Sequence, residues 1–114
     1  MLDPSANDFG WSTAGDIVAA IASGHASALS VVEAALARIR ERDPLLNSFT
    51  AVTEQRALTR ARALDDARVK GKQAGPLNGV PFAVKNLYDV AGLATLAGSK
   101  INRDAPPATR DAAN

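Results

Sequence analysis

The chain has 114 residues, of which 46% are hydrophobic, 22% are charged and 4% are aromatic, and its net charge is +1. Because basic and acidic residues are interspersed and no run of about 18 apolar residues occurs, the sequence predicts neither a nucleic-acid partner nor a membrane span. The absence of cysteine excludes disulfides, thiolate metal sites and a cysteine nucleophile, and it fits a cytoplasmic location.

A first helix is predicted over about 13–23. Thr13, with Asp16 three residues later, has the spacing of a capping box, in which each side chain accepts a hydrogen bond from the other residue's backbone N–H group. Gly24 ends this helix. Its apolar face consists of Ile17, Val18 and Ile21.

A second helix is predicted over about 28–42, with Ser27 as its N-cap and Pro44 closing it. Apolar residues recur at helical spacing along it, at Leu29, Val32, Leu36 and Ile39. Because the link between the first two helices is short, we expect them to form an antiparallel or steeply crossed hairpin.

A third helix is predicted over about 54–70, after a short extended piece at 49–52. Thr53 stands at its N-cap position and Gly71 at its end. The face of this helix is rich in alanine, which allows a neighbouring helix to approach closely.

A strand is predicted over about 79–85, because Val80, Phe82 and Val84 alternate with the residues of the other face. A turn-rich loop follows, with a second short extended piece expected near Val90. A single strand leaves its backbone groups without partners, and this chain offers few strands to supply them.

The last residues predict the start of another helix, with Thr109 as its cap and residues 111–113 as its first turn. A helix of one turn cannot nucleate or bury a face. The sequence therefore predicts the front part of a longer chain.

Few side chains offer chemistry on their own. His25 is the only histidine, and its place in the link after the first helix favours a structural or solvent-exposed role over a catalytic one. Without grouped ligands, no metal site is expected, and without a glycine-rich phosphate loop, no cofactor. Asp65 and Asp66 are interpreted as a solvated pair on a helix surface.

Lys85 is the exception, because it stands where a strand ends and a loop of small residues begins. Burying an ammonium group is costly, so the simplest interpretation places it in water. The alternative is a general base, which requires the neutral amine and a nearby hydroxyl. The hydroxyl residues in the following loop are Tyr88, Thr95 and Ser99.

The stretch GPLNGVPFAVKNLYDVAG at 75–92, followed by TLAGS at 95–99, resembles the N-terminal part of amidase signature hydrolases. The resemblance covers about 12–114. Leu96 and the residues at 100–103 look most like the branch that hydrolyses carboxybiuret or biuret in s-triazine and cyanuric acid breakdown. Many other members have aspartate at the position of Asn86 and threonine at that of Leu96.

The resemblance implies an α/β fold with a mixed central sheet, of which this chain would supply the N-terminal helical layer and the first strand or strands. It also implies a triad of serine, cis-serine and lysine, in which Lys85 matches the family lysine. Both serines would lie downstream of residue 114, so we expect the isolated chain to be inactive. Ser99 matches neither serine, and with Gly98 it is expected to line or brace the site.

Three functions follow as hypotheses. The first is C–N bond hydrolysis of a small amide or urea-like substrate of the carboxybiuret or biuret type, with no metal or cofactor and with a homodimer or a small partner subunit possible in the parent. The second is the A subunit of the tRNA-dependent glutamine amidotransferase, which would bring charged tRNA and partner subunits. The third, from another class, is a small helical binding module without catalysis.

Overall fold

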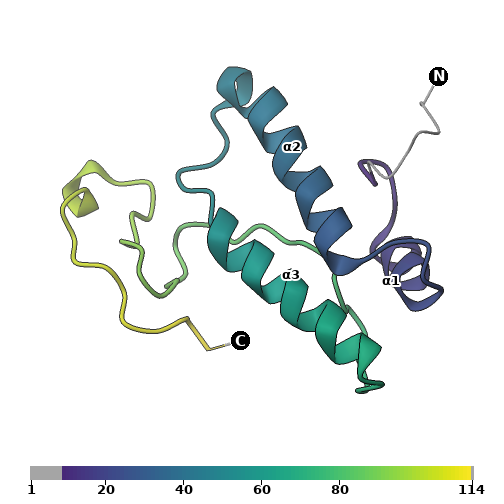
Figure 1. Ribbon diagram of the computed structural model, residues 1–114. Helices are drawn as coiled ribbons and strands as arrows, with labels where there is room; N and C mark the ends of the chain where they lie inside the picture. Colours follow the sequence, from purple (N-terminus) through teal and green to yellow (C-terminus); the bar gives the residue numbers. More distant parts are fainter. Residues whose placement is uncertain (1–8, 114) are drawn as a thin grey trace. The chain divides into compact units, whose positions relative to one another are not determined.

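The computed structural model describes residues 9–113. Three α-helices lie within this range, α1 (Ala14–Ala22), α2 (Ala28–Leu46) and α3 (Glu54–Val69), with a short 3-10 helix, η1 (Lys100–Asn102) (Figure 1). The chain divides into two compact units that meet in the sequence between Pro81 and Phe82. We refer to residues 9–81 as the helical unit and to residues 82–113 as the loop unit, and describe each by itself.

The start of α1 is the predicted capping box. The Thr13 side chain accepts a hydrogen bond from the backbone N–H of Asp16, and the Asp16 carboxylate accepts one from the backbone N–H of Thr13, both at 3.1 Å. These two bonds satisfy N–H groups that have no partner inside the helix. Gly24, just past the end of α1, has a φ of 82°.

The start of α2 is capped as predicted, because the Ser27 hydroxyl accepts a hydrogen bond from the Ser30 N–H at 3.0 Å. The predicted end of this helix is wrong, since α2 continues through Pro44 to Leu46. Because proline has no backbone N–H group, α2 lacks one helical hydrogen bond at Pro44, yet it continues for two more residues. The helix stops instead at Asn47, which has a left-handed φ of 53°.

The helices α2 and α3 pack side by side and run in opposite directions (Figure 1). Thr53 precedes α3 as predicted, although its side chain makes no capping hydrogen bond. The helices enclose a small core of seven buried residues, Ile17, Ile21, Ala28, Val31, Val32, Leu36 and Ala61. Ala61 is the residue of α3 among these buried positions, and its small side chain leaves room for α2 beside it.

Gly79 closes the helical unit by packing against α1 and the start of α2. It is buried and has a φ of 81°. A Cβ atom there would overlap the Ile21 side chain and lie 3.2 Å from the Cβ of Ala28. Position 79 therefore requires glycine for two reasons: its φ is positive, and no space is left for a side chain. Val80 continues the contact with the core.

The predicted strand over 79–85 is absent. Residues 80–85 have no regular secondary structure, and no strand occurs between residues 9 and 113, so the mixed sheet of the expected α/β fold is not confirmed. The physical reason is that a strand needs a neighbour for its N–H and C=O groups. The segments expected to supply one, at 49–52 and near Val90, are also irregular.

The loop unit is held together by hydrogen bonds between its first and last segments. Three backbone bonds of 2.9 Å join residues 89–93 to residues 108–112, from Gly92 to Ala108, from Ala108 to Leu93 and from Ala112 to Asp89. The helix predicted to begin at Thr109 is not formed up to residue 113. The backbone groups of Ala108 and Ala112 are instead bonded to residues 89–93.

Candidate functional site

Lys85 lies at the surface of the loop unit. Its side chain is exposed, and within residues 9–113 its ammonium group makes no hydrogen bond or ion pair. Its carbonyl oxygen accepts a hydrogen bond from the Tyr88 N–H at 3.1 Å, which forms a turn directly after it. The structure therefore places Lys85 in water, and its catalytic role stays a prediction.

Asn86 ties the Lys85 segment to the loop that the sequence predicted to lie near it. The Asn86 carbonyl oxygen accepts a hydrogen bond from the Ala97 N–H at 2.8 Å, and its side-chain Oδ1 accepts one from the Leu96 N–H at 3.2 Å. Sequence reasoning missed this role. The available signal was a hydrogen-bonding side chain next to Lys85, at a position where aspartate could accept the same bond.

Gly98 and Ser99 form a turn that Asn86 holds in place. Ala97 and Gly98 both have left-handed backbones, with φ of 48° and 67°. The half-buried Ser99 caps η1, because its Oγ accepts a hydrogen bond from the Ile101 N–H at 3.3 Å. Ser99 thus braces its own loop, and its contact with a substrate stays a prediction.

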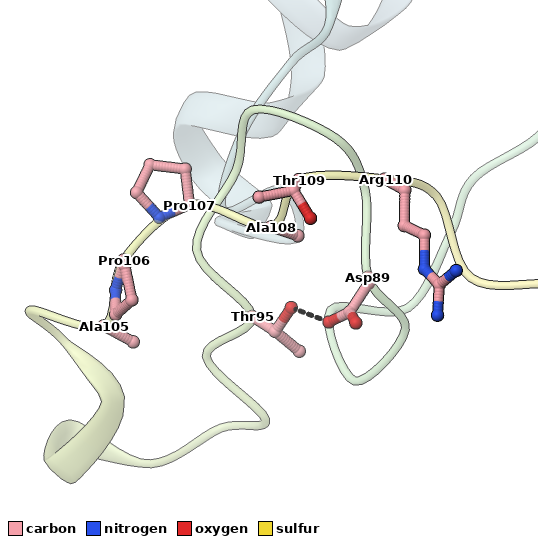
Figure 2. Close-up of a pocket in the computed structure, with 8 residues that line it drawn as sticks. All are labelled: Asp89, Thr95, Ala105, Pro106, Pro107, Ala108, Thr109 and Arg110. Atoms are coloured by element: carbon pink, nitrogen blue, oxygen red, sulfur yellow. Dashed lines mark hydrogen bonds between the residues drawn. The ribbon is translucent and has the colours of Figure 1, made fainter.

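The loop unit contains an open pocket of about 370 Å³ (Figure 2). The Thr95 hydroxyl donates a hydrogen bond to the Asp89 carboxylate across it, at 2.5 Å. The residues that line the pocket are Asp89, Thr95, Ala105, Pro106, Pro107, Ala108, Thr109 and Arg110. Lys85 is not one of them, so this pocket is not built around the predicted base.

The described residues offer little other chemistry. No group of three histidine, cysteine or carboxylate side chains within residues 9–113 could hold a metal ion. The exposed His25 shares a hydrogen bond of 2.6 Å between its Nδ1 atom and the Ser23 hydroxyl, and the role expected for it stays a prediction. In the same part of the chain, no helix combines the length and apolar character needed to cross a membrane.

Asp65 departs from its predicted role as half of a solvated pair. It is half-buried, and its two carboxylate oxygens accept hydrogen bonds from the backbone N–H groups of Ala28 at 2.8 Å and Leu29 at 3.0 Å. Asp66, by contrast, is exposed. The sequence could not reveal this contact, since the partners lie 36 and 37 residues apart.

Hydrolysis by nucleophilic catalysis needs a hydroxyl within hydrogen-bond reach of a base. Within residues 9–113, no hydroxyl group is hydrogen-bonded to the candidate base, Lys85. The amidase family model matches residues 30–113, and the chain belongs to this family. The resemblance seen at 75–99 is thereby confirmed.

Within the family, the chain is similar to proteins of two kinds. The chain is 53% identical over 97 residues to AtzE, one of the subunits of the 1-carboxybiuret hydrolase of Pseudomonas sp. (strain ADP), covering 85% of this chain and 21% of that protein. It is 46% identical over 89 residues to the A subunit of the glutamyl-tRNA(Gln) amidotransferase of Streptomyces coelicolor, covering 78% and 18%. The chain spans about a fifth of the length of the curated relatives it matches.

The structure agrees with the sequence comparison. It matches a solved chain of a vestigial protein complex that bears on the evolutionary origins of an s-triazine catabolic enzyme, with a TM-score of 0.81 and 53% identity. The match covers 83% of this chain and 21% of that one. An inhibitor-bound form of the same complex gives the same values. The described residues therefore have the fold of part of an amidase signature chain.

Proposed function

We propose that the protein to which these residues belong hydrolyses a C–N bond of a small amide or urea-like substrate of the carboxybiuret or biuret type. The observation that carries the proposal is the Lys85 segment, within a chain that is 53% identical to part of a 1-carboxybiuret hydrolase. The reaction takes place in the cytoplasm and uses no metal or cofactor. AtzE is one subunit of its enzyme and the solved chain belongs to a protein complex, which supports a partner for the parent protein as well.

In the proposed mechanism, neutral Lys85 is the base of a serine, cis-serine and lysine relay. It takes a proton from the middle serine, which takes one from the nucleophilic serine as the latter attacks the carbonyl carbon. Backbone N–H groups stabilise the oxyanion that forms. The C–N bond breaks as the proton returns to the leaving nitrogen, and water then hydrolyses the acyl-enzyme. Both serines belong to the parent downstream of residue 114.

The proposal requires surroundings for Lys85 beyond residues 9–113. A neutral amine is favoured by desolvation or by neighbouring cations. We propose that the parent removes water from Lys85 by pairing residues 79–85 as a strand of its mixed central sheet. The exposure of Phe82, at 83%, supports this proposal, because an apolar side chain of that size gains free energy when it is covered.

A second candidate is the A subunit of a tRNA-dependent glutamine amidotransferase, favoured by the 46% identity to such a protein. The substrate would then be glutamine, and the partners would be charged tRNA and further subunits. The third candidate, a small helical binding module, would unfold cooperatively as an isolated monomer. Membership of the amidase family favours the two catalytic candidates over it.

The test is ammonia release by the purified full-length parent, with 1-carboxybiuret, biuret and glutamine offered separately. The proposal expects turnover of a urea-like substrate that exceeds turnover of glutamine. Release from glutamine alone would transfer the assignment to the amidotransferase. Turnover of none of the three, by a folded parent, would contradict both.

A further inference from the structure

The helical unit has a pocket of its own, of about 170 Å³, where the chain turns back after α3. One wall is a stripe of α3 that includes Arg60, Leu64 and Arg68, which share one face of the helix because they are spaced four residues apart. The other wall comes from residues 72–78, which we call the return segment. The pocket therefore exists because the return segment folds against α3.

The return segment is tied to the helical unit at both ends. At its start, Gly71 has a φ of 73° and turns the chain, and the Lys72 N–H donates a hydrogen bond of 3.0 Å to the Ala67 carbonyl oxygen. At its far end, the next residue is Gly79, which is buried against α1 and α2. This wall of the pocket is therefore part of the fold of residues 9–81.

The polar side chains of the pocket are three cations and two amides. They are Arg60, Arg68, Lys72, Gln73 and Asn78. No carboxylate of residues 9–113 is among the lining residues. Because arginine and lysine side chains donate hydrogen bonds and accept none, the pocket presents mainly donors and positive charge. Such a lining is complementary to a ligand with negative charge and several acceptor oxygens.

The positive charge of the pocket is not paired within the helical unit. Neither Arg60 nor Lys72 makes a hydrogen bond or an ion pair in the described range. Arg68 donates one N–H group to the Ala22 carbonyl oxygen at 3.4 Å, and a guanidinium group has four more to offer. Asp65, three residues before Arg68, has both carboxylate oxygens bonded to N–H groups of α2.

The pocket also has an apolar part and enough room for a small anion. Its apolar residues Leu64 and Ala67 are half-buried, and Leu64 packs against the core. Charges interact more strongly beside such a surface than in bulk water, because the local dielectric constant is lower. A volume of about 170 Å³ is several times the roughly 30 Å³ share of one water molecule, so a phosphate group and a few waters fit.

We propose that this pocket binds the phosphate group of a small molecule. A phosphate group carries about two negative charges near neutral pH and has at least three acceptor oxygens, which suits three cations and two amides. Arginine binds phosphate oxygens through two parallel hydrogen bonds, and lysine binds them as a point charge. A single carboxylate, with one charge, would leave two of the cations unpaired. Free inorganic phosphate and a phosphate monoester present the same group to the pocket.

The test is isothermal titration calorimetry of the purified full-length parent at low ionic strength. Inorganic phosphate is expected to bind once per chain, with a Kd on the order of 1 mM or tighter. Added sodium chloride is expected to weaken the binding, because the three cations are exposed and salt screens their charges. Phenyl phosphate, titrated in parallel, distinguishes the two sources of the group. Tighter binding of phenyl phosphate supports a monoester as the ligand, and tighter binding of inorganic phosphate supports the free ion.

Three variants of the full-length parent locate the site. Arg60→Gln and Lys72→Gln each remove one unpaired cation of the pocket and are expected to raise the Kd for phosphate by about three- to tenfold. Arg62→Gln removes the same charge from an exposed position of α3 outside the pocket, and this matched control is expected to keep the Kd within about twofold. Melting temperatures check that each variant is folded, and if one of the two pocket variants does not fold, the other decides.

Two results would overturn the proposal. The first is a folded wild-type parent that binds no phosphate at millimolar concentrations, which would leave the cations near the end of α3 with a favourable effect on the helix dipole alone. The second is an equal rise in Kd in Arg62→Gln, because binding would then follow net charge. Phosphate binding does not involve Lys85, so Lys85→Ala is expected to keep it, and the proposed hydrolysis and the phosphate site can fail separately.

Discussion

The Asn86 carbonyl oxygen accepts a hydrogen bond from the Ala97 N–H at 2.8 Å, so the residue after Lys85 is fixed to the turn that begins the Gly98 and Ser99 loop. A side-chain bond from the Leu96 N–H to Asn86 Oδ1 reinforces the link at 3.2 Å. The two parts of the amidase-like stretch that the sequence singled out are thereby joined through one asparagine.

Removing the Asn86 side chain is expected to loosen this link. Asn86→Ala deletes the acceptor for the Leu96 N–H, at a cost of about 1 kcal/mol for one hydrogen bond. Asn86→Asp keeps an acceptor in the same place and is the matched control. Amide hydrogen exchange at Leu96 measures the effect, and we expect faster exchange in Asn86→Ala alone. Equal exchange in all three proteins would show that the side-chain bond does not hold the loop.

Lys85→Ala is expected to abolish turnover by the full-length parent, because the relay loses its base. The fold should be kept, since the Lys85 side chain is exposed and has no partner within residues 9–113. Lys100→Ala, which removes another exposed lysine of the loop unit, is the control and should retain activity. Circular dichroism checks the fold and ammonia release checks the rate. Near-normal turnover by Lys85→Ala would remove the basis of the proposed function.

The 114-residue chain by itself is expected to show no amide hydrolysis. Within residues 9–113, no hydroxyl is paired with Lys85, and nucleophilic catalysis needs that pair. Ammonia release from 1-carboxybiuret, biuret and glutamine is the measurement, with the full-length parent as the positive control. Turnover by the purified chain above the Lys85→Ala background would show that a nucleophile is present within it.

Asp65→Ala is expected to lower the free energy of unfolding by about 0.5–2 kcal/mol, the range found when a helix loses an N-cap acceptor. Asp66→Ala removes an exposed carboxylate and should change it by less than about 0.5 kcal/mol. Urea denaturation followed by the helical signal measures both. A similar loss in the two variants would mean that Asp65 acts by its charge alone and that its hydrogen bond to Ala28 does not contribute to the free energy of unfolding.

Gly79→Ala is expected to lower the free energy of unfolding by at least about 2 kcal/mol, because alanine is strained at a left-handed φ and its methyl group overlaps Ile21. Gly71 has a φ of 73° with no atom within 4 Å of an added Cβ. Gly71→Ala therefore meets the backbone strain alone and should cost about 1 kcal/mol. Thermal unfolding of the two variants gives the difference, and equal melting temperatures would contradict the overlap at Gly79.

Local patterns account for what could be predicted from the sequence. The capping box of Thr13 and Asp16 and the cap of Ser27 involve residues three positions apart, so the chain itself brings the partners together. The stretch at 75–99 was enough to predict the family, since its residue types and spacing are specific. The alternation around Phe82 predicted a strand, but alternation describes which side chains share a face and does not supply a hydrogen-bonding neighbour.

The sequence by itself determined the starts of α1, α2 and α3, the amidase family and Lys85 as the candidate base, although the helix start that it predicted at Thr109 is wrong. Only the tertiary structure decided that Asp65 caps α2 and that Asn86 joins the two parts of the loop unit. It also decided that Gly79 admits no side chain. These features depend on groups that are distant along the chain and come together when α2 and α3 pack and the loop unit closes. A sequence pattern reveals periodicity and hydrogen bonds between near neighbours in the chain. Contacts between distant residues depend on how the whole unit packs.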